Sequence, residues 1–148
     1  MADTRVQLEV EDWVRREWMP SALHQRFRRE RVPLSSGGVF DFDAVSDDDA
    51  MVATISTSGS STSGGKPAVG KLLKIRSDML FLLLAKAERR IVVLTEPDMH
   101  ELCMKERAGG RVPPEIEFAL AEIPEALRAK LAKARKSASD EVTPRGRT

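Results

Sequence analysis

The sequence predicts a single α/β domain in which helices flank a mixed central β-sheet. Two kinds of pattern indicate this fold class: several segments repeat apolar residues at helical spacing, whereas residues 39–45 and 91–94 have the patterns of strands. The chain has 148 residues, of which 41% are hydrophobic, and a chain of this length can bury a core without disulfides or a structural metal. We expect the domain to span residues 1–136, with its core at about 4–123.

The first predicted element is an amphipathic helix over about residues 4–19. Its apolar residues share one side at helical spacing: Leu8, Val10, Trp13, Val14 and Trp18. Pro20 opposes continuation of this helix, because a proline ring clashes with the preceding turn. Residues 31–34 are a candidate for one further short strand.

A β-hairpin is predicted next. Residues 39–45 alternate strictly, which places the two phenylalanines and Ala44 on one face of a strand and Asp41 and Asp43 on the other. An acidic turn follows, and residues 51–58 are rich in β-branched side chains. The pair is therefore expected to form two antiparallel strands.

The middle of the chain combines a loop, a helix and a strand. Residues 59–70 are rich in glycine and serine, which predicts a mobile loop. Helical spacing returns over 71–86 with a wide apolar stripe, which predicts a mostly buried helix. Residues 91–94 are apolar without interruption, as in a strand that is covered on both faces and lies centrally in a sheet.

The last third of the domain continues the alternation of helix and strand. A helix is expected from Thr95 to about Arg107, followed by a strand at 116–120 and a last helix that begins at Pro124. After Ser137 the chain is polar and charged, and we expect residues 137–148 to be a disordered tail.

Composition excludes several classes of function. The net charge of +1 gives no global basic excess for nucleic acid, and no apolar run approaches the ~20 residues needed to cross a bilayer. Cys103 is the single cysteine, so the chain has no disulfide framework. We expect a cytoplasmic protein without a membrane partner.

One motif suggests a phosphate-binding loop. Residues 65–71 fit GxxxxGK and precede a helix, but Leu72 stands where such a loop places the serine or threonine that holds magnesium. The preceding strand is also too far away in the sequence. A glycine-rich loop before a helix is the simpler interpretation.

A family resemblance depends on the predicted hairpin. A helix, Gly37-Gly38, Phe42-Asp43-Ala44-Val45, an acidic turn, residues 52–58, a loop, a long helix and a hydrophobic strand follow one another. This order resembles the αβββαβ core of the PD-(D/E)XK restriction-endonuclease-like superfamily. The resemblance implies that fold and the family's chemistry, in which an Asp and a Glu hold a divalent cation and a Lys stabilises charge on phosphate.

The motif is degenerate in this chain. The resemblance matches Asp43 to the first metal-binding Asp, with Asp41 as an adjacent alternative. Thr54 stands at the position of the Glu and Ser56 at that of the Lys. A hydroxyl is a poor ligand for a hard cation and carries no positive charge, so the remnant site lacks its second carboxylate and its cation.

The helix after the hairpin offers replacements. Lys71 near the start of the helix is a candidate for the missing Lys, and Asp78 is a candidate for the missing Glu. Four basic residues follow the hairpin without an acidic residue between them and are candidates for binding nucleic acid: Lys66, Lys71, Lys74 and Arg76.

The leading hypothesis is a catalytically impaired nuclease-fold protein, without a cofactor, that binds nucleic acid or a protein partner and forms a homodimer. The first alternative is an active nuclease that uses Asp43, relocated partner residues and Mg²⁺ or Mn²⁺; the second is a structural or assembly subunit. If the family resemblance holds, Asp43, Thr54 and Ser56 should point to one side of the sheet, towards residues 59–70.

Overall fold

The computed structural model describes residues 4–61 and 64–142, with side chains through residue 136. Five strands form one sheet in chain order: β1 (Phe27–Pro33), β2 (Val39–Ser46), β3 (Met51–Ser56), β4 (Arg89–Leu94) and β5 (Ile116–Leu120). The first two pairs of neighbours are antiparallel, whereas β3, β4 and β5 run parallel to one another. The predicted α/β fold class with a mixed sheet is confirmed.

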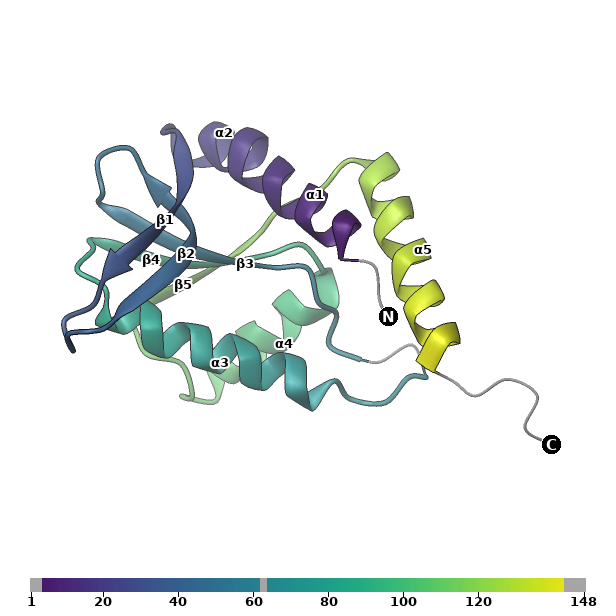
Figure 1. Ribbon diagram of the computed structural model, residues 1–148. Helices are drawn as coiled ribbons and strands as arrows, with labels where there is room; N and C mark the ends of the chain where they lie inside the picture. The colour runs from purple at the N-terminus through teal and green to yellow at the C-terminus, as the bar shows by residue number, and fades with distance from the viewer. Residues whose placement is uncertain (1–3, 62–63, 143–148) are drawn as a thin grey trace.

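Helices cover both faces of the sheet, which gives three layers (Figure 1). The N-terminal helices α1 (Arg5–Trp13), η1 (Val14–Trp18) and α2 (Met19–Leu23) share one face with α5 (Glu125–Val142). The helices α3 (Val69–Leu84) and α4 (Pro97–Ala108) cover the other. Each face buries its own apolar cluster, so the sheet separates two halves of the core. Within the described residues, no helix is long and apolar enough to cross a membrane.

The N-terminal helical segment continues past Pro20, where the sequence predicts its end. The turns just before Pro20 are π-helical, and Pro20 then occupies the first turn of α2. A proline is tolerated at that position because its missing N–H has no partner within a helix there. The segment ends only at Leu23, before His24 in the left-handed conformation.

Strand β1 is longer than the candidate strand in the sequence. It begins at Phe27, and along it buried or half-buried positions alternate with exposed ones. Its exposed positions are mostly charged, which suits an edge strand because charge discourages pairing with another chain. In this strand, Arg29 forms an ion pair with Asp41 of β2, with 3.2 Å between nitrogen and oxygen.

A β-bulge in β2 breaks the alternation that the sequence predicts. Between positions that pair with β1 on either side, β2 has one extra residue, so Asp43 and Ala44 lie together opposite Arg29. As a result, Phe42 packs into the cluster beneath α3, whereas Ala44 belongs to the cluster beneath α1. The prediction that these two residues share a face is wrong, because a bulge shifts the period of two by one residue.

Two helices differ from their predicted form. Helix α3 is half-buried rather than mostly buried, because Leu73 and Leu80 are 52% and 54% exposed. Helix α5 extends to Val142 and so includes residues 137–142, which the sequence assigns to the tail; residues 143–148 lie outside the described part of the chain. The prediction of a buried strand at 91–94 is confirmed, since β4 is buried throughout this stretch.

Two leucines of α3 provide a test of this packing. Leu82 is fully buried between α3 and the sheet, so we expect Leu82→Ala to lower the free energy of unfolding by about 2 to 5 kcal/mol. Leu80→Ala removes the same atoms from a position that is 54% exposed and should change the free energy by only about 0.5 kcal/mol. Urea denaturation of both variants measures the difference, and equal effects would contradict this placement of α3.

Candidate functional site

A cavity of about 890 Å³ lies where α1, β2, β3 and the start of α3 meet. Its wall contains carboxylates, ammonium groups and hydroxyls together, from segments that are far apart in the sequence. The residues that carry charge are Glu11 of α1, Asp43 of β2, and Lys71, Lys74 and Asp78 of α3. Several of these are candidates from the sequence, and the fold brings them to one place.

Asp43 lies in the bulge of β2, where hydrogen bonds hold both its side chain and its backbone. One carboxylate oxygen, Oδ2, accepts a hydrogen bond of 2.8 Å from the backbone N–H of Ile55 in β3. On the other side, Arg15 donates a hydrogen bond of 3.0 Å to the backbone carbonyl oxygen of Asp43. Burial raises the pKa of Asp43, the Ile55 hydrogen bond opposes this shift, and the negative charge of Asp78 adds to it.

Two more carboxylates share this environment. Burial, and then the charge of Asp43, raise the pKa of Glu11 to about 6. Burial also raises the pKa of Asp78, which Lys74 opposes through a hydrogen bond of 2.5 Å between Nζ and Oδ1. Three buried or half-buried carboxyl groups thus share the cavity with the ammonium groups of Lys71 and Lys74.

The three remnant motif positions do not all lie at the cavity. Asp43 and Ser56 line the cavity together, as expected from the sequence. Thr54 is not part of the wall; it lies in the sheet, paired with Val92 of β4, and is 3% exposed. Its hydroxyl oxygen has no hydrogen-bond partner among the described residues. Two of the three positions therefore border the cavity, and Thr54 does not.

The other candidate site residues from the sequence lie partly at the cavity and partly elsewhere. Lys71 and Lys74 line the cavity, at positions that lie on one side of α3 together with Asp78. Arg76 points to α4 instead, where it forms an ion pair of 2.5 Å with Glu106. Asp41 is engaged by Arg29 on the edge of the sheet, and the exposed Lys66 is not part of the wall.

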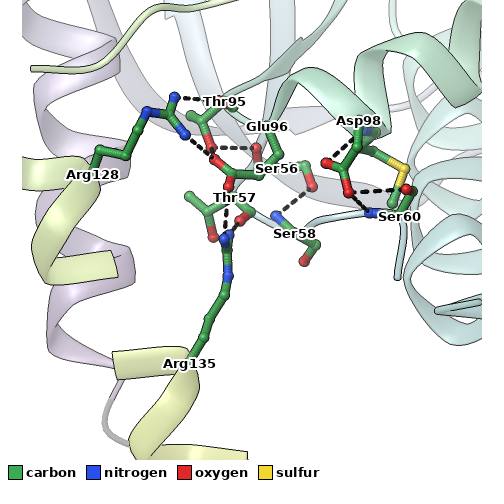
Figure 2. Close-up of polar contacts among 10 residues, drawn as sticks. Ser56, Thr57, Ser58, Ser60, Thr95, Glu96, Asp98, Arg128 and Arg135 are labelled. Atoms are coloured by element: carbon green, nitrogen blue, oxygen red, sulfur yellow. Dashed lines mark hydrogen bonds and ion pairs between the residues drawn. The ribbon is translucent and has the colours of Figure 1, made fainter. Parts of the chain in front are cut away.

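The segment after β3 forms another part of the wall. Ser58 and residues 67–71 border the cavity, and Asp98 of α4 holds the intervening chain by accepting hydrogen bonds of 3.0 Å from both the N–H and the hydroxyl of Ser60 (Figure 2). The carbonyl oxygen of Ser60 in turn accepts a hydrogen bond from the N–H of Ala68. The strand that precedes the GxxxxGK segment ends at Ser56, well before Gly65, as the sequence indicates.

A buried acid ties α5 to the same wall. Glu96 lies between two arginines of α5 and forms ion pairs with Arg128 at 3.3 Å and Arg135 at 2.6 Å (Figure 2). The guanidinium of Arg135 also donates a hydrogen bond to the backbone carbonyl oxygen of Thr57, which borders the cavity. We call Glu96, Arg128 and Arg135 the α5 clasp. Its effect is to fix the backbone just after β3.

Sequence reasoning missed Glu11 and the α5 clasp. Glu11 is next to the buried Val10 in α1, at the border of the apolar stripe, and that position was the one signal available.

Compared with models of protein families, curated proteins and solved structures, the chain shows no significant match to any of them. Within residues 4–61 and 64–142, no group of three or more His, Cys, Asp or Glu side chains is arranged to hold a metal ion.

The raised pKa of Glu11 predicts a pH-dependent cost to stability. Between the ordinary pKa of 4.5 and about 6, the unfolded chain ionises this carboxyl while the folded protein keeps its proton. The stability that Glu11 contributes at low pH is therefore lost as the pH rises through about 6. Glu11→Gln should be more stable than the wild type at pH 7 by about 1 kcal/mol, after allowance for partial exposure.

Denaturation of this variant in urea from pH 4 to pH 7 measures the effect. Glu17→Gln, at an exposed position of the same helical segment, is the matched control and should keep the pH dependence of the wild type. If the free energy of unfolding of Glu11→Gln changed with pH as steeply as that of the wild type, this would contradict the electrostatic account of the cavity.

The α5 clasp predicts a loss of stability when one arginine is removed. Arg135→Met keeps most of the apolar stem but leaves the buried Glu96 with Arg128 alone, which should cost about 1 to 2 kcal/mol. Lys133→Met, at an exposed position of the same helix, is the control and should have an effect within about 0.5 kcal/mol. Thermal unfolding compares the two, and equal midpoints would show that the clasp contributes nothing measurable.

Proposed function

We propose that the protein is a metal-dependent nuclease of the restriction-endonuclease-like type, in which Asp43 works with relocated partner residues. One observation carries this proposal: Glu11, Lys74 and Asp78 line the same cavity as Asp43. The element order supports it as well, since a helix, three antiparallel strands, a helix and a parallel strand follow one another as in an αβββαβ core.

The donor atoms at the cavity suit a hard divalent cation. Carboxylate oxygens are the ligands that Mg²⁺ and Mn²⁺ prefer, and Mg²⁺ is commonly held by one or two carboxylates together with water and substrate phosphates. Asp43 with either Glu11 or Asp78 supplies such a pair. Burial raises the pKa of all three groups, and a bound cation would favour their charged forms and so offset that cost.

The chain's own residues then have separate roles. Asp43 and its acidic neighbours hold the cation, which when bound supplies Lewis acidity and an activated water for hydrolysis. Lys74 replaces the cation missing at Ser56, since its ammonium group is at the cavity and can donate to a phosphate oxygen as negative charge develops. Lys71, in the first turn of α3, binds the phosphate together with the helix N-terminus.

A second candidate function is nucleic-acid binding without cleavage. It is favoured by Thr54 and Ser56, which stand where the family resemblance implies a Glu and a Lys, and by the position of Thr54 outside the wall. In that case the cavity is a degenerate catalytic site. A cytoplasmic location, a protein partner and a homodimer are expectations from the sequence alone.

The two candidates differ in their response to metal. If the nuclease proposal holds, Mg²⁺ or Mn²⁺ at about ten times its dissociation constant should stabilise the wild type by about 1.4 kcal/mol, which raises the melting temperature by about 3 to 6 °C. Asp43→Asn should abolish this shift and the metal-dependent cleavage of an oligonucleotide. Asp41→Asn is the matched control, because Asp41 pairs with Arg29 outside the cavity, and it should keep both.

The absence of a thermal shift and of cleavage with either metal would favour binding without catalysis. Cleavage that survives Asp43→Asn would defeat the proposed site altogether. A protein that binds neither metal nor nucleic acid would instead suit a structural or assembly subunit.

A further inference from the structure

The basic residues of helix α5 lie together, between the acidic residues near its two ends. Between Glu125 and Asp140 it contains no acidic residue, whereas five basic residues follow one another closely. They are Arg128, Lys130, Lys133, Arg135 and Lys136. With Glu125, Asp140 and Glu141 counted, the helix has a net charge of +2 in a chain of net charge +1, and its positive charge is concentrated in its middle.

These basic residues have two different roles. Arg128 and Arg135 are used by the α5 clasp and point back to the sheet. Lys133 and Lys136 are exposed and form no hydrogen bond or ion pair with the described residues. Lys130 is also exposed, and its pairing with Glu9 at 3.2 Å is a surface contact of little strength.

The three lysines form a row along the helix. A spacing of three residues corresponds to a rise of about 4.5 Å, and successive side chains turn by about 60° around the axis. The row therefore follows the outer side of α5, while Leu127 and Leu131 pack into the core. Because flexible lysine stems can follow a curved polyanion, such a row suits contact with consecutive phosphates.

The clasp fixes this row relative to the cavity. Arg135 lies between Lys133 and Lys136 in the sequence, and its guanidinium contacts the carbonyl oxygen of Thr57 on the cavity wall. The second half of α5 thus runs beside the segment that follows β3 (Figure 1). A polyanion that leaves the cavity and passes around α5 would meet this row on the outer side of the helix.

We propose that Lys133 and Lys136 on the outer side of α5 bind the phosphate backbone of a nucleic acid strand whose neighbouring segment enters the cavity. This inference rests on the proposed function, in that nucleic acid is the ligand. It adds a binding surface outside the cavity that supplies affinity without reading sequence, because a lysine contacts phosphate as a point charge.

The test is a binding measurement that does not need the metal. Fluorescence anisotropy with a short labelled oligonucleotide is measured in EDTA from about 50 to 200 mM NaCl, with duplex DNA, single-stranded DNA and RNA as separate probes. The variant is Lys133→Gln with Lys136→Gln. The matched control is Lys86→Gln with Lys105→Gln, which removes the same charge from exposed positions distant from α5 in the sequence.

We expect the α5 variant to bind the preferred probe about tenfold more weakly, and the dependence of log K on log salt to become less steep by about 2. The control pair should match the wild type. Circular dichroism should show the same helix content and melting temperature for both variants, since the substituted side chains are exposed. The probe that loses most affinity identifies the nucleic acid.

Three results would overturn the inference: equal binding by the α5 variant and the wild type, an equal loss in the control pair, or wild-type binding to phosphatidylserine vesicles but to no oligonucleotide. Cleavage by the wild type in Mg²⁺ is recorded in parallel. If cleavage is present and the α5 variant binds normally, this inference fails while the proposed nuclease stands. If binding depends on Lys133 and Lys136 but cleavage is absent, the inference stands and the nuclease proposal fails.

Discussion

One hydrogen bond, from the backbone N–H of Ile55 to the carboxylate of Asp43, connects the central sheet to the cavity. The regular pairing of β2 with β3 ends at Ala44 and Ala53, next to the bulge. There a side-chain oxygen accepts the bond in place of a backbone carbonyl, so the N–H of Ile55 keeps a partner although the ladder has ended. This one interaction therefore links β2 to β3 beyond their regular pairing and also holds the carboxylate of Asp43 at the cavity.

The charges around that acid oppose folding to a small degree. Glu11, Asp43 and Asp78 each favour the protonated form more strongly than an exposed acid does, because burial penalises the charged form of all three. Within the described part of the chain, the ion pair that these three acids form is the one between Asp78 and Lys74. Buried acids with raised pKa values are common where a protein binds a ligand of opposite charge. This property distinguishes the acids of the cavity from those in the ion pairs on the edge of the sheet.

The sequence predicted what local patterns can encode. Alternation located the hairpin and Asp43, and an unbroken apolar run located the buried strand at 91–94. It failed where the cause is distant: the bulge depends on pairing with β1, and Arg135 reaches Thr57 across 78 positions of the chain. Periodicity also overestimated the burial of Leu80, since a stripe of leucines is wider than the face that one sheet can cover.

The α5 clasp also affects the order in which the site can be completed during synthesis. A chain emerges from the ribosome with its N-terminal part first, so the residues from Glu11 to Asp78 are available well before Arg128 and Arg135. The backbone at Thr57 cannot take this anchor until α5 has formed. A nascent chain therefore has a cavity wall without its anchor until α5 has been made, and a truncation before α5 removes the contact that holds Thr57.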